Sequence, residues 1–267
     1  MKDINKLIVA NWKMNPQSKK DAEIIFKNIS LFVKNLKKID VVVCPPYPYL
    51  YIKDKIKNKK LKLGSQDVFY EKEGSYTSEV SIGMLKDFGV EYVILGHSER
   101  RMTGDTNIII NKKILATLKA KINPIFCIGE SKRDANGFYL SFIKQQIIEG
   151  LALVTKPQMK NVVIAYEPVW AIGNNAVREA TAGEFIEIRI YIKKIIADLF
   201  DIKTANEIKI IYGGSVHPTN ANIFIKDGGA DGLLVGRDSL NKKLFHCSVT
   251  RIENICTSLS KVPMTSV

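Results

Sequence analysis

The sequence predicts an α/β fold, a closed (β/α)8 barrel of eight parallel strands with outer helices, and three observations support this prediction. Eight short apolar runs rich in β-branched residues recur along the chain. Their apolar character is continuous rather than alternating, as expected for parallel strands that are covered on both faces. Successive runs start about 32 residues apart, the length of one strand with its crossover helix. An open, doubly wound sheet is the main alternative.

The predicted elements follow one another without interruption. The segments between the strands are amphipathic, most clearly at 22–36 and 185–199, where apolar residues recur every three or four positions. Thr181, followed three residues later by Glu184, predicts a capping box at the start of the second of these helices. The predicted strands are, in order, 7–10, 41–44, 61–63, 92–95, 125–128, 162–166, 208–212 and 233–235.

The domain organisation follows from the same pattern. We find no linker, low-complexity tract or second domain, so we expect a single barrel domain over residues 1–267. The terminal residues 261–267 are expected to be frayed.

Composition limits the class of protein. The chain has 267 residues, of which 46% are hydrophobic and 9% aromatic, so burial can offset the entropy of folding. Forty basic and 27 acidic side chains leave a net charge of +13. The lysines are scattered among Ile and Asn rather than clustered, so we predict no nucleic-acid partner. No apolar stretch approaches the roughly 20 residues that span a bilayer, and the run at 7–10 is too short for a signal peptide, so no membrane association is expected.

The cysteines indicate a reducing environment. Cys44, Cys127, Cys247 and Cys256 lie at least nine residues apart, which provides neither a CxxC metal spacing nor a dense disulfide framework. We therefore expect free thiols, no metal and a cytoplasmic location.

Candidate catalytic residues follow the predicted strands. In a (β/α)8 barrel, the residues after the carboxyl end of each strand gather on one face. Asn11 and Lys13 follow the first strand, His97 the fourth and Glu167 the sixth. Each alone has an ordinary structural explanation, such as a salt-bridge partner or a solvated side chain. Together they would bring an ammonium, an imidazole and a carboxylate to a common pocket.

Glycine-rich turns follow the last two strands, at 213–215 and at Gly236. Tight turns need glycine irrespective of function. In this architecture, however, these turns commonly hold phosphate through backbone amides and the positive end of a short helix. We therefore expect an anionic, phosphorylated substrate. The other two histidines, His217 and His246, lie within or beside predicted helices and are expected to be structural.

Five segments that adjoin the predicted strands form a recognisable set of motifs. They are Ala10-Asn11-Trp12-Lys13-Met14-Asn15, Ile94-Leu95-Gly96-His97-Ser98-Glu99-Arg100-Arg101, Cys127-Ile128-Gly129-Glu130, Ala165-Tyr166-Glu167-Pro168-Val169-Trp170-Ala171-Ile172-Gly173 and Tyr212-Gly213-Gly214-Ser215-Val216. In this order and at these separations, over residues 7 to about 240, they resemble the triosephosphate isomerase family. The resemblance implies a TIM barrel that interconverts dihydroxyacetone phosphate and D-glyceraldehyde 3-phosphate, in glycolysis and gluconeogenesis, without a metal or an organic cofactor.

The resemblance also implies roles for individual residues. Glu167 is the base that removes the carbon-bound proton, and His97 is the electrophile and proton shuttle that polarises the carbonyl. A carboxylate must approach a weakly acidic C–H bond while donor groups stabilise the enediolate oxygens, and Lys13 and Asn11 are expected to supply such groups.

Supporting and binding roles follow in the same way. Glu99 is expected to be a supporting acid, and Ser98 to cap the helix that begins after His97. Residues 168–177 resemble the lid of the family. By the resemblance, substrate is bound by Asn11 and Lys13, and its phosphate by Gly173, Ser215, Gly236 and Arg237.

Three positions depart from the family pattern. Residues 174–178 differ from the usual lid sequence, and Asn175 could adopt the left-handed geometry of the usual glycine. Arg237 replaces a glycine, which would cost roughly 1 kcal/mol or more if its φ is positive, although its backbone amide could still donate to phosphate. We expect its side chain to lie in solvent, and a guanidinium that reaches the phosphate is the alternative. Ser78 stands where glycine is usual.

The long connection at 66–78 suggests a partner surface. Loops of this length tend to be functional, and exposed aromatic residues such as Phe69, Tyr70 and Tyr76 indicate an interface. In the family, this loop inserts into the other subunit of a homodimer with Thr77 near the partner's active site. We therefore predict a homodimer.

Two other functions remain open. Another phosphate-binding barrel isomerase or an aldolase-like lyase is one of them, although a lyase would need a Schiff-base lysine late in a strand, and no predicted strand ends in lysine. A module that binds anionic partners through its charge is the other, and such binding would weaken steeply with salt.

Overall fold

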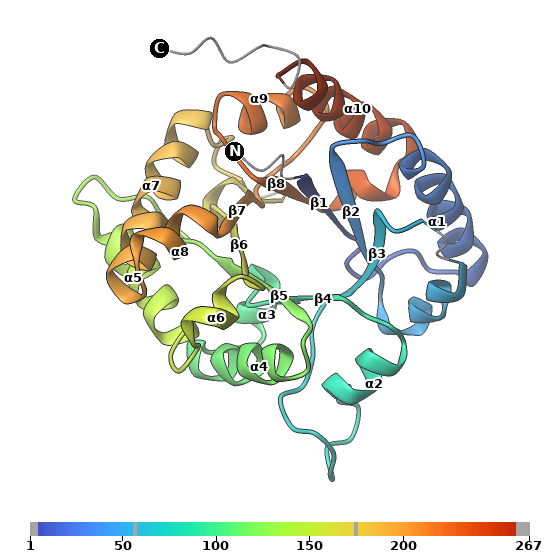
Figure 1. Ribbon diagram of the computed structural model, residues 1–267, viewed down its shortest axis with the longest axis horizontal. Coiled ribbons are helices and arrows are strands. Elements are labelled where there is room, and N and C mark those ends of the chain that lie inside the picture. Colours follow the sequence, from blue (N-terminus) through green and yellow to red (C-terminus); the bar gives the residue numbers. More distant parts are fainter. Residues whose placement is uncertain (1–4, 56–57, 174–175, 260–267) are drawn as a thin grey trace.

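Eight parallel strands close into a barrel in the order β1 to β8, each paired with the next along the chain and β8 paired with β1 (Figure 1). The computed structural model describes residues 5–55, 58–173 and 176–259. The register between β1 and β8 runs from Leu7 opposite Gly232 to Ala10 opposite Val235. This pairing closes the sheet, so the predicted (β/α)8 TIM barrel is confirmed and the open doubly wound sheet is excluded.

Each strand end lies within two residues of its prediction, and all eight predicted runs are strands. The strands are β1 (Lys6–Asn11), β2 (Ile39–Cys44), β3 (Leu61–Ser65), β4 (Tyr92–Leu95), β5 (Asn123–Ile128), β6 (Val163–Tyr166), β7 (Lys209–Tyr212) and β8 (Gly232–Val235).

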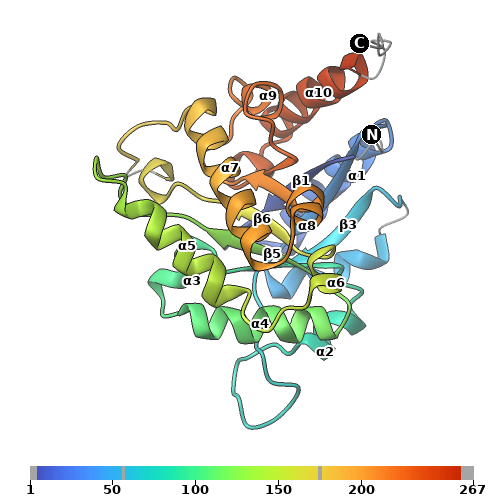
Figure 2. The ribbon, with the colours of Figure 1, turned by 60° about the vertical axis from the view of Figure 1, so that its left-hand side comes forward.

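Helices surround the barrel and connect its strands (Figures 1 and 2). The α-helices are α1 (Lys19–Val33), α2 (Ile82–Asp87), α3 (Ser98–Met102), α4 (Asn107–Lys119), α5 (Phe138–Gly150), α6 (Lys156–Met159), α7 (Ala182–Leu199), α8 (Ile202–Glu207), α9 (Ala221–Lys226) and α10 (Lys242–Leu259). Short 3-10 helices occur at η1 (Tyr47–Lys55), η2 (Val169–Ala171) and η3 (Arg237–Leu240).

Local sequence signals place the two clearest helices. Helix α1 begins after Ser18, whose side chain accepts the backbone N–H of Asp21, and ends three residues before the predicted limit at 36. Helix α7 begins after Thr181, and the predicted capping box with Glu184 is present in both directions. Such a box satisfies two otherwise unpaired N–H groups of the first turn.

The apolar residues form two layers on the two faces of the strands. Residues on the inner faces fill the barrel interior, and those on the outer faces pack against the helices. Because both faces of each strand are buried, the strands have the continuous apolar sequences that predicted them. The interior layer consists of Leu7, Val9, Val42, Cys44, Ile94, Ile125, Cys127, Val163, Ala165, Ile211 and Leu234.

The connection between β3 and α2 projects from the body of the molecule (Figures 1 and 2). Its base is closed by a hydrogen bond from the backbone N–H of Phe69 to the carbonyl of Val80, at 2.8 Å. The ring of Phe69 packs against those of Tyr70 and Tyr76, at centroid distances of 4.5 and 4.7 Å. Of the three aromatic residues predicted to be exposed, Tyr76 is exposed, whereas Phe69 and Tyr70 are partly buried because the rings cover one another.

Several expectations concern the chain's environment. No disulfide joins any of the four cysteines, all of which lie in the described part of the chain, and Cys44 and Cys127 are buried in the barrel. In the described part of the chain, no helix has both the length and the apolarity that crossing a membrane requires. The same residues contain no group of acidic, histidine or cysteine side chains that could hold a metal ion. The predicted fraying at 261–267 lies outside the described residues.

Candidate active site

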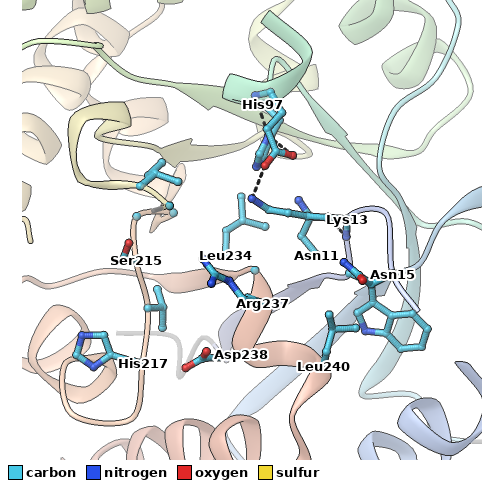
Figure 3. Close-up of a pocket in the computed structure, with 18 residues that line it drawn as sticks. Asn11, Lys13, Asn15, His97, Ser215, His217, Leu234, Arg237, Asp238 and Leu240 are labelled. Atoms are coloured by element: carbon cyan, nitrogen blue, oxygen red, sulfur yellow. Dashed lines mark hydrogen bonds and ion pairs between the residues drawn. The ribbon is translucent and has the colours of Figure 1, made fainter. Parts of the chain in front are cut away.

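The loops that follow the strands surround a cavity of about 540 Å³ (Figure 3). Most of the predicted site residues line it, although they come from five separate loops. Glu167 does not line it, but its Oε1 lies 3.4 Å from Nε2 of His97, which does. Thr77 lies in the projecting loop and does not line the cavity either. The predicted residues in the lining are Asn11, Lys13, His97, Glu99, Gly173, Ser215, Gly236 and Arg237.

The backbone of Glu167 is fixed directly after β6. Its N–H donates to the carbonyl of Ile128 at 2.8 Å. Its own carbonyl oxygen passes so close to Gly129 that a Cβ atom there would lie 1.8 Å from it. Gly213 adjoins the side chain, and a Cβ there would lie 3.1 Å from Cγ of Glu167. Glycines at 129 and 213 therefore let the β5 and β7 loops close around the carboxylate.

The carboxylate of Glu167 is buried, with 2% of the residue exposed. Oε2 accepts the backbone N–H of Ser98 at 3.0 Å. Oε1 lies 3.4 Å from Nε2 of His97 and accepts no hydrogen bond from any described residue. A buried oxygen without a partner is unfavourable in the resting protein, and it is also free to accept a proton.

His97 occupies the N-cap position of α3, and its Nδ1 accepts the backbone N–H of Glu99 at 3.2 Å. When the ring is neutral, a nitrogen that accepts a hydrogen bond carries no proton, so the proton is on Nε2, which faces Glu167. The capping role predicted for Ser98 is wrong, because His97 is the cap and the N–H of Ser98 points at the carboxylate of Glu167 instead.

Lys13 and Asn11 leave β1 in an unusual backbone geometry. Lys13 has a φ of +53°, which costs a non-glycine residue roughly 1 kcal/mol. Its N–H donates to Oδ1 of Asn11 at 3.0 Å, and its carbonyl accepts Nε2 of Gln66 at 2.8 Å. Its Nζ pairs with Oε1 of Glu99 at 2.6 Å. Gln66 also donates to the carbonyl of Cys44. Its role was not predicted from the sequence, because no local spacing indicates contacts between residues so far apart in the chain.

Three residues of the lining present backbone donors that have no partner in the described part of the chain. The N–H groups of Gly173, Ser215 and Gly236 donate to no other group in the described part of the chain. The hydroxyl of Ser215 donates to the carbonyl of Ala171 at 2.7 Å and so joins the β6 and β7 loops. Arg237 begins η3, and its φ is not positive, so the strain considered for this substitution does not arise. Such a set of free N–H groups can bind an anion.

Two further residues of the lining were not predicted. His217, expected to be structural, lies on the cavity wall, where Nε2 is 3.0 Å from Oε1 of Glu179. Asp238 brings a second carboxylate to the cavity, after Glu99. Burial raises the pKa of Asp238, and the charges of His217 and Arg237 oppose this shift. His246 stacks on Phe32 at 4.1 Å, as expected of a structural histidine.

Both flanks of the predicted lid, 168–177, are anchored. Glu130 accepts the indole N–H of Trp170 at 2.7 Å, and burial raises the pKa of this carboxyl. On the far side, the Arg178 guanidinium lies 4.5 Å from the centre of the Trp170 ring and pairs with Glu184. Asn174 and Asn175, where the sequence departs from the lid pattern, lie outside the described residues.

The fold and the cavity together are those of a (β/α)8-barrel enzyme, with an imidazole, an ammonium and free backbone N–H groups around one cavity. The model of the family described as triosephosphate isomerase matches residues 6–252. The triosephosphate isomerase of Carboxydothermus hydrogenoformans is 42% identical over 89% of this chain and 95% of its own length. Those of Dictyoglomus thermophilum and Aquifex aeolicus are each 41% identical, over 90% and 91% of this chain and 96% and 97% of their own lengths.

The chain therefore belongs to the triosephosphate isomerase family, as the sequence motifs predicted. Its activity is the interconversion of dihydroxyacetone phosphate and glyceraldehyde 3-phosphate in glycolysis.

Proposed function

We propose that this chain isomerises its substrate by proton transfer through an enediolate, with Glu167 as the base and His97 as the electrophile. The observation that carries this proposal is the position of Oε1 of Glu167, which accepts no hydrogen bond from the described residues and lies 3.4 Å from the ring nitrogen Nε2 of His97. A three-carbon substrate in the adjoining cavity could contact both groups at once, which acid–base catalysis requires.

The proton path follows from these positions. Oε1 of Glu167 takes a proton from one carbon and returns it to the next. The Nε2–H of His97 donates to the carbonyl oxygen and passes its proton between the two substrate oxygens as the enediolate forms. The ammonium of Lys13 and the amide of Asn11, which line the same cavity, stabilise the negative charge that develops on these oxygens. Glu99 supports this arrangement by pairing with Lys13.

The phosphate of the substrate would bind at the other end of the cavity. The free N–H groups of Gly173, Ser215 and Gly236 support this assignment, because they have no other acceptor among the described residues. The backbone of Arg237 continues the same turn. The substrate is thereby held with its carbons near His97, and such positioning lowers the entropic part of the barrier.

The remaining proposals concern assembly and location. We infer a homodimer, formed through the projecting loop with Thr77 at its tip, because residues 71–79 are exposed on the isolated chain. A single domain over 1–267 and a cytoplasmic location also remain proposals, and the absence of a disulfide among the described cysteines supports the second of them.

The test of the catalytic proposal is the Glu167→Gln variant in a coupled isomerase assay. Loss of the carboxylate removes the base, so kcat should fall by about 10³-fold or more while the circular dichroism spectrum stays unchanged. Glu207→Gln, at an exposed position at the end of α8, is the matched control and should keep wild-type turnover. Wild-type turnover in Glu167→Gln would refute the role of Glu167, and a substrate adduct trapped by borohydride would indicate a lyase.

A further inference from the structure

The charged side chains of the described lining are equal in number and opposite in sign. Within the described lining, Lys13 and Arg237 carry positive charges, and Glu99 and Asp238 carry negative charges. The ammonium of Lys13 lies 2.6 Å from Glu99, so this cation is already matched by a carboxylate of the cavity. Asp238 is the second carboxylate, and Arg237 is the cation next to it in the chain.

A carboxylate in this position is unfavourable for the proposed substrate. The triose phosphate brings a dianionic group to the end of the cavity that holds Gly236 and Asp238. Without the guanidinium of Arg237, the lining would carry a net negative charge there, and like charges at short range repel. Burial raises the pKa of Asp238, and the charges of His217 and of the exposed Arg237 oppose this rise.

The position of Arg237 suits a phosphate ligand. It follows Gly236, whose backbone N–H is free, and in Figure 3 it lies between Ser215 on one side and Lys13 on the other. The ammonium of Lys13 reaches the same end, because a Cβ atom on Gly236 would lie 4.0 Å from Nζ of Lys13. Guanidinium groups bind phosphate through two parallel N–H donors, which a glycine at 237 could not supply.

We propose that the side chain of Arg237, and not only its backbone, binds the substrate phosphate, and that Asp238 opposes it, so that this pair sets the affinity of the cavity for dianions. This inference rests on the proposed function, since it assigns a ligand to the phosphate end of the same cavity. Arg237 is then a substrate-binding residue that determines specificity for phosphorylated trioses.

The first test is the Arg237→Met variant, which keeps the backbone amide and removes the charge. We expect KM for glyceraldehyde 3-phosphate and the inhibition constant of inorganic phosphate each to rise about tenfold, which corresponds to one lost charge-assisted contact. The effect should fall on KM rather than on kcat. The reaction of unphosphorylated D-glyceraldehyde should not change, because this substrate lacks the group that Arg237 binds. Arg237→Lys, which keeps the charge, should retain most of the phosphate affinity.

Two further variants guard against a general effect of charge or folding. Asp238→Asn should tighten phosphate binding about threefold, a change of opposite sign that a folding defect would not produce. Lys144→Met removes one positive charge from an exposed position on α5 and should leave both constants unchanged.

Direct titration with inorganic phosphate, followed by calorimetry, separates this inference from the catalytic proposal because it needs no turnover. Equal phosphate affinities in Arg237→Met and Lys144→Met, or no tightening in Asp238→Asn, would overturn the proposed pair even if Glu167→Gln abolishes isomerisation. Weaker phosphate binding in Arg237→Met and tighter binding in Asp238→Asn would support the proposed pair even if the catalytic roles were wrong.

Discussion

The His97–Glu167 pair and the projecting loop between β3 and α2 differ in what covers them. The pair is enclosed by its own chain, with 7% of His97 and 2% of Glu167 exposed. The loop extends away from the barrel, and residues 71–79 are exposed throughout. The rings of Phe69 and Tyr76 in this loop pack on each other.

The contacts within one chain are enough to orient His97 and Glu167, whereas the projecting loop would need a second chain to pack against. The two proposed catalytic groups are already oriented by backbone contacts, the N–H of Ser98 to Glu167 and that of Glu99 to His97. The loop has a closed base but nothing against which its tip can pack. We therefore expect substitutions at the pair to change the chemical step, and substitutions at the loop tip to change assembly.

The largest expected effect is at the pair. His97→Gln keeps an acceptor near the N–H of Glu99 but removes the group that donates and accepts a proton at Nε2. We expect kcat to fall about 10²- to 10⁴-fold, with a smaller change in KM. Steady-state kinetics with both substrates measure it. His246→Gln, on α10, is the matched control, and a comparable loss of kcat there would mean that His97 acts through the fold rather than the chemistry.

An intermediate effect is expected at the loop tip. Thr77→Arg places a long cation where a partner would have to enclose it, and burial of an unpaired charge at an interface costs about 2–5 kcal/mol. The dimer dissociation constant should rise at least about tenfold in sedimentation equilibrium. Ser141→Arg, at an exposed position on α5, should not change it. If wild-type protein is a monomer at all concentrations, the proposed role of the loop is wrong.

The smallest expected effect is at Ser78, whose φ is +74°. This is the position where the family pattern has glycine, and it requires the left-handed geometry that glycine adopts without strain. Ser78→Gly should raise the free energy of unfolding by about 0.5 kcal/mol, since relief of strain exceeds the added entropy of the unfolded chain. Urea unfolding at matched protein concentration measures it. The neighbouring Ser75→Gly should have the opposite sign, because Ser75 does not have a positive φ.

The ion pairs at the root of the loop could not be predicted from the sequence. The root carries Asp67, which lies 2.9 Å from Nζ of Lys113, and the same ammonium lies 2.7 Å from Asp105. Lys113 is 2% exposed, although its lysine-rich helix resembles a solvated surface in sequence. A lysine is buried only when paired, and here the partner on the loop is 46 residues away. No local pattern could have indicated this network, which ties the root of the loop to α4.

The sequence by itself determined the features that arise from short-range periodicity. The eight apolar runs, the spacing between them and the capping box at Thr181 predicted the strands, the barrel and the start of α7, because each depends on residues within a few positions of one another. The motifs likewise placed the proposed catalytic residues after the ends of strands, and these ends share one face because all strands point the same way.

Only the tertiary structure decided how these groups meet. The contact between Oε1 of Glu167 and Nε2 of His97 involves residues 70 positions apart in the chain. Gln66 donates a hydrogen bond to the backbone carbonyl of Lys13, 53 positions away. Arg237 replaces a glycine without strain, because the turn after β8 enters η3 with a φ that is not positive. Such distances are set when β8 closes on β1, because closure alone brings the ends of all eight strands around one cavity.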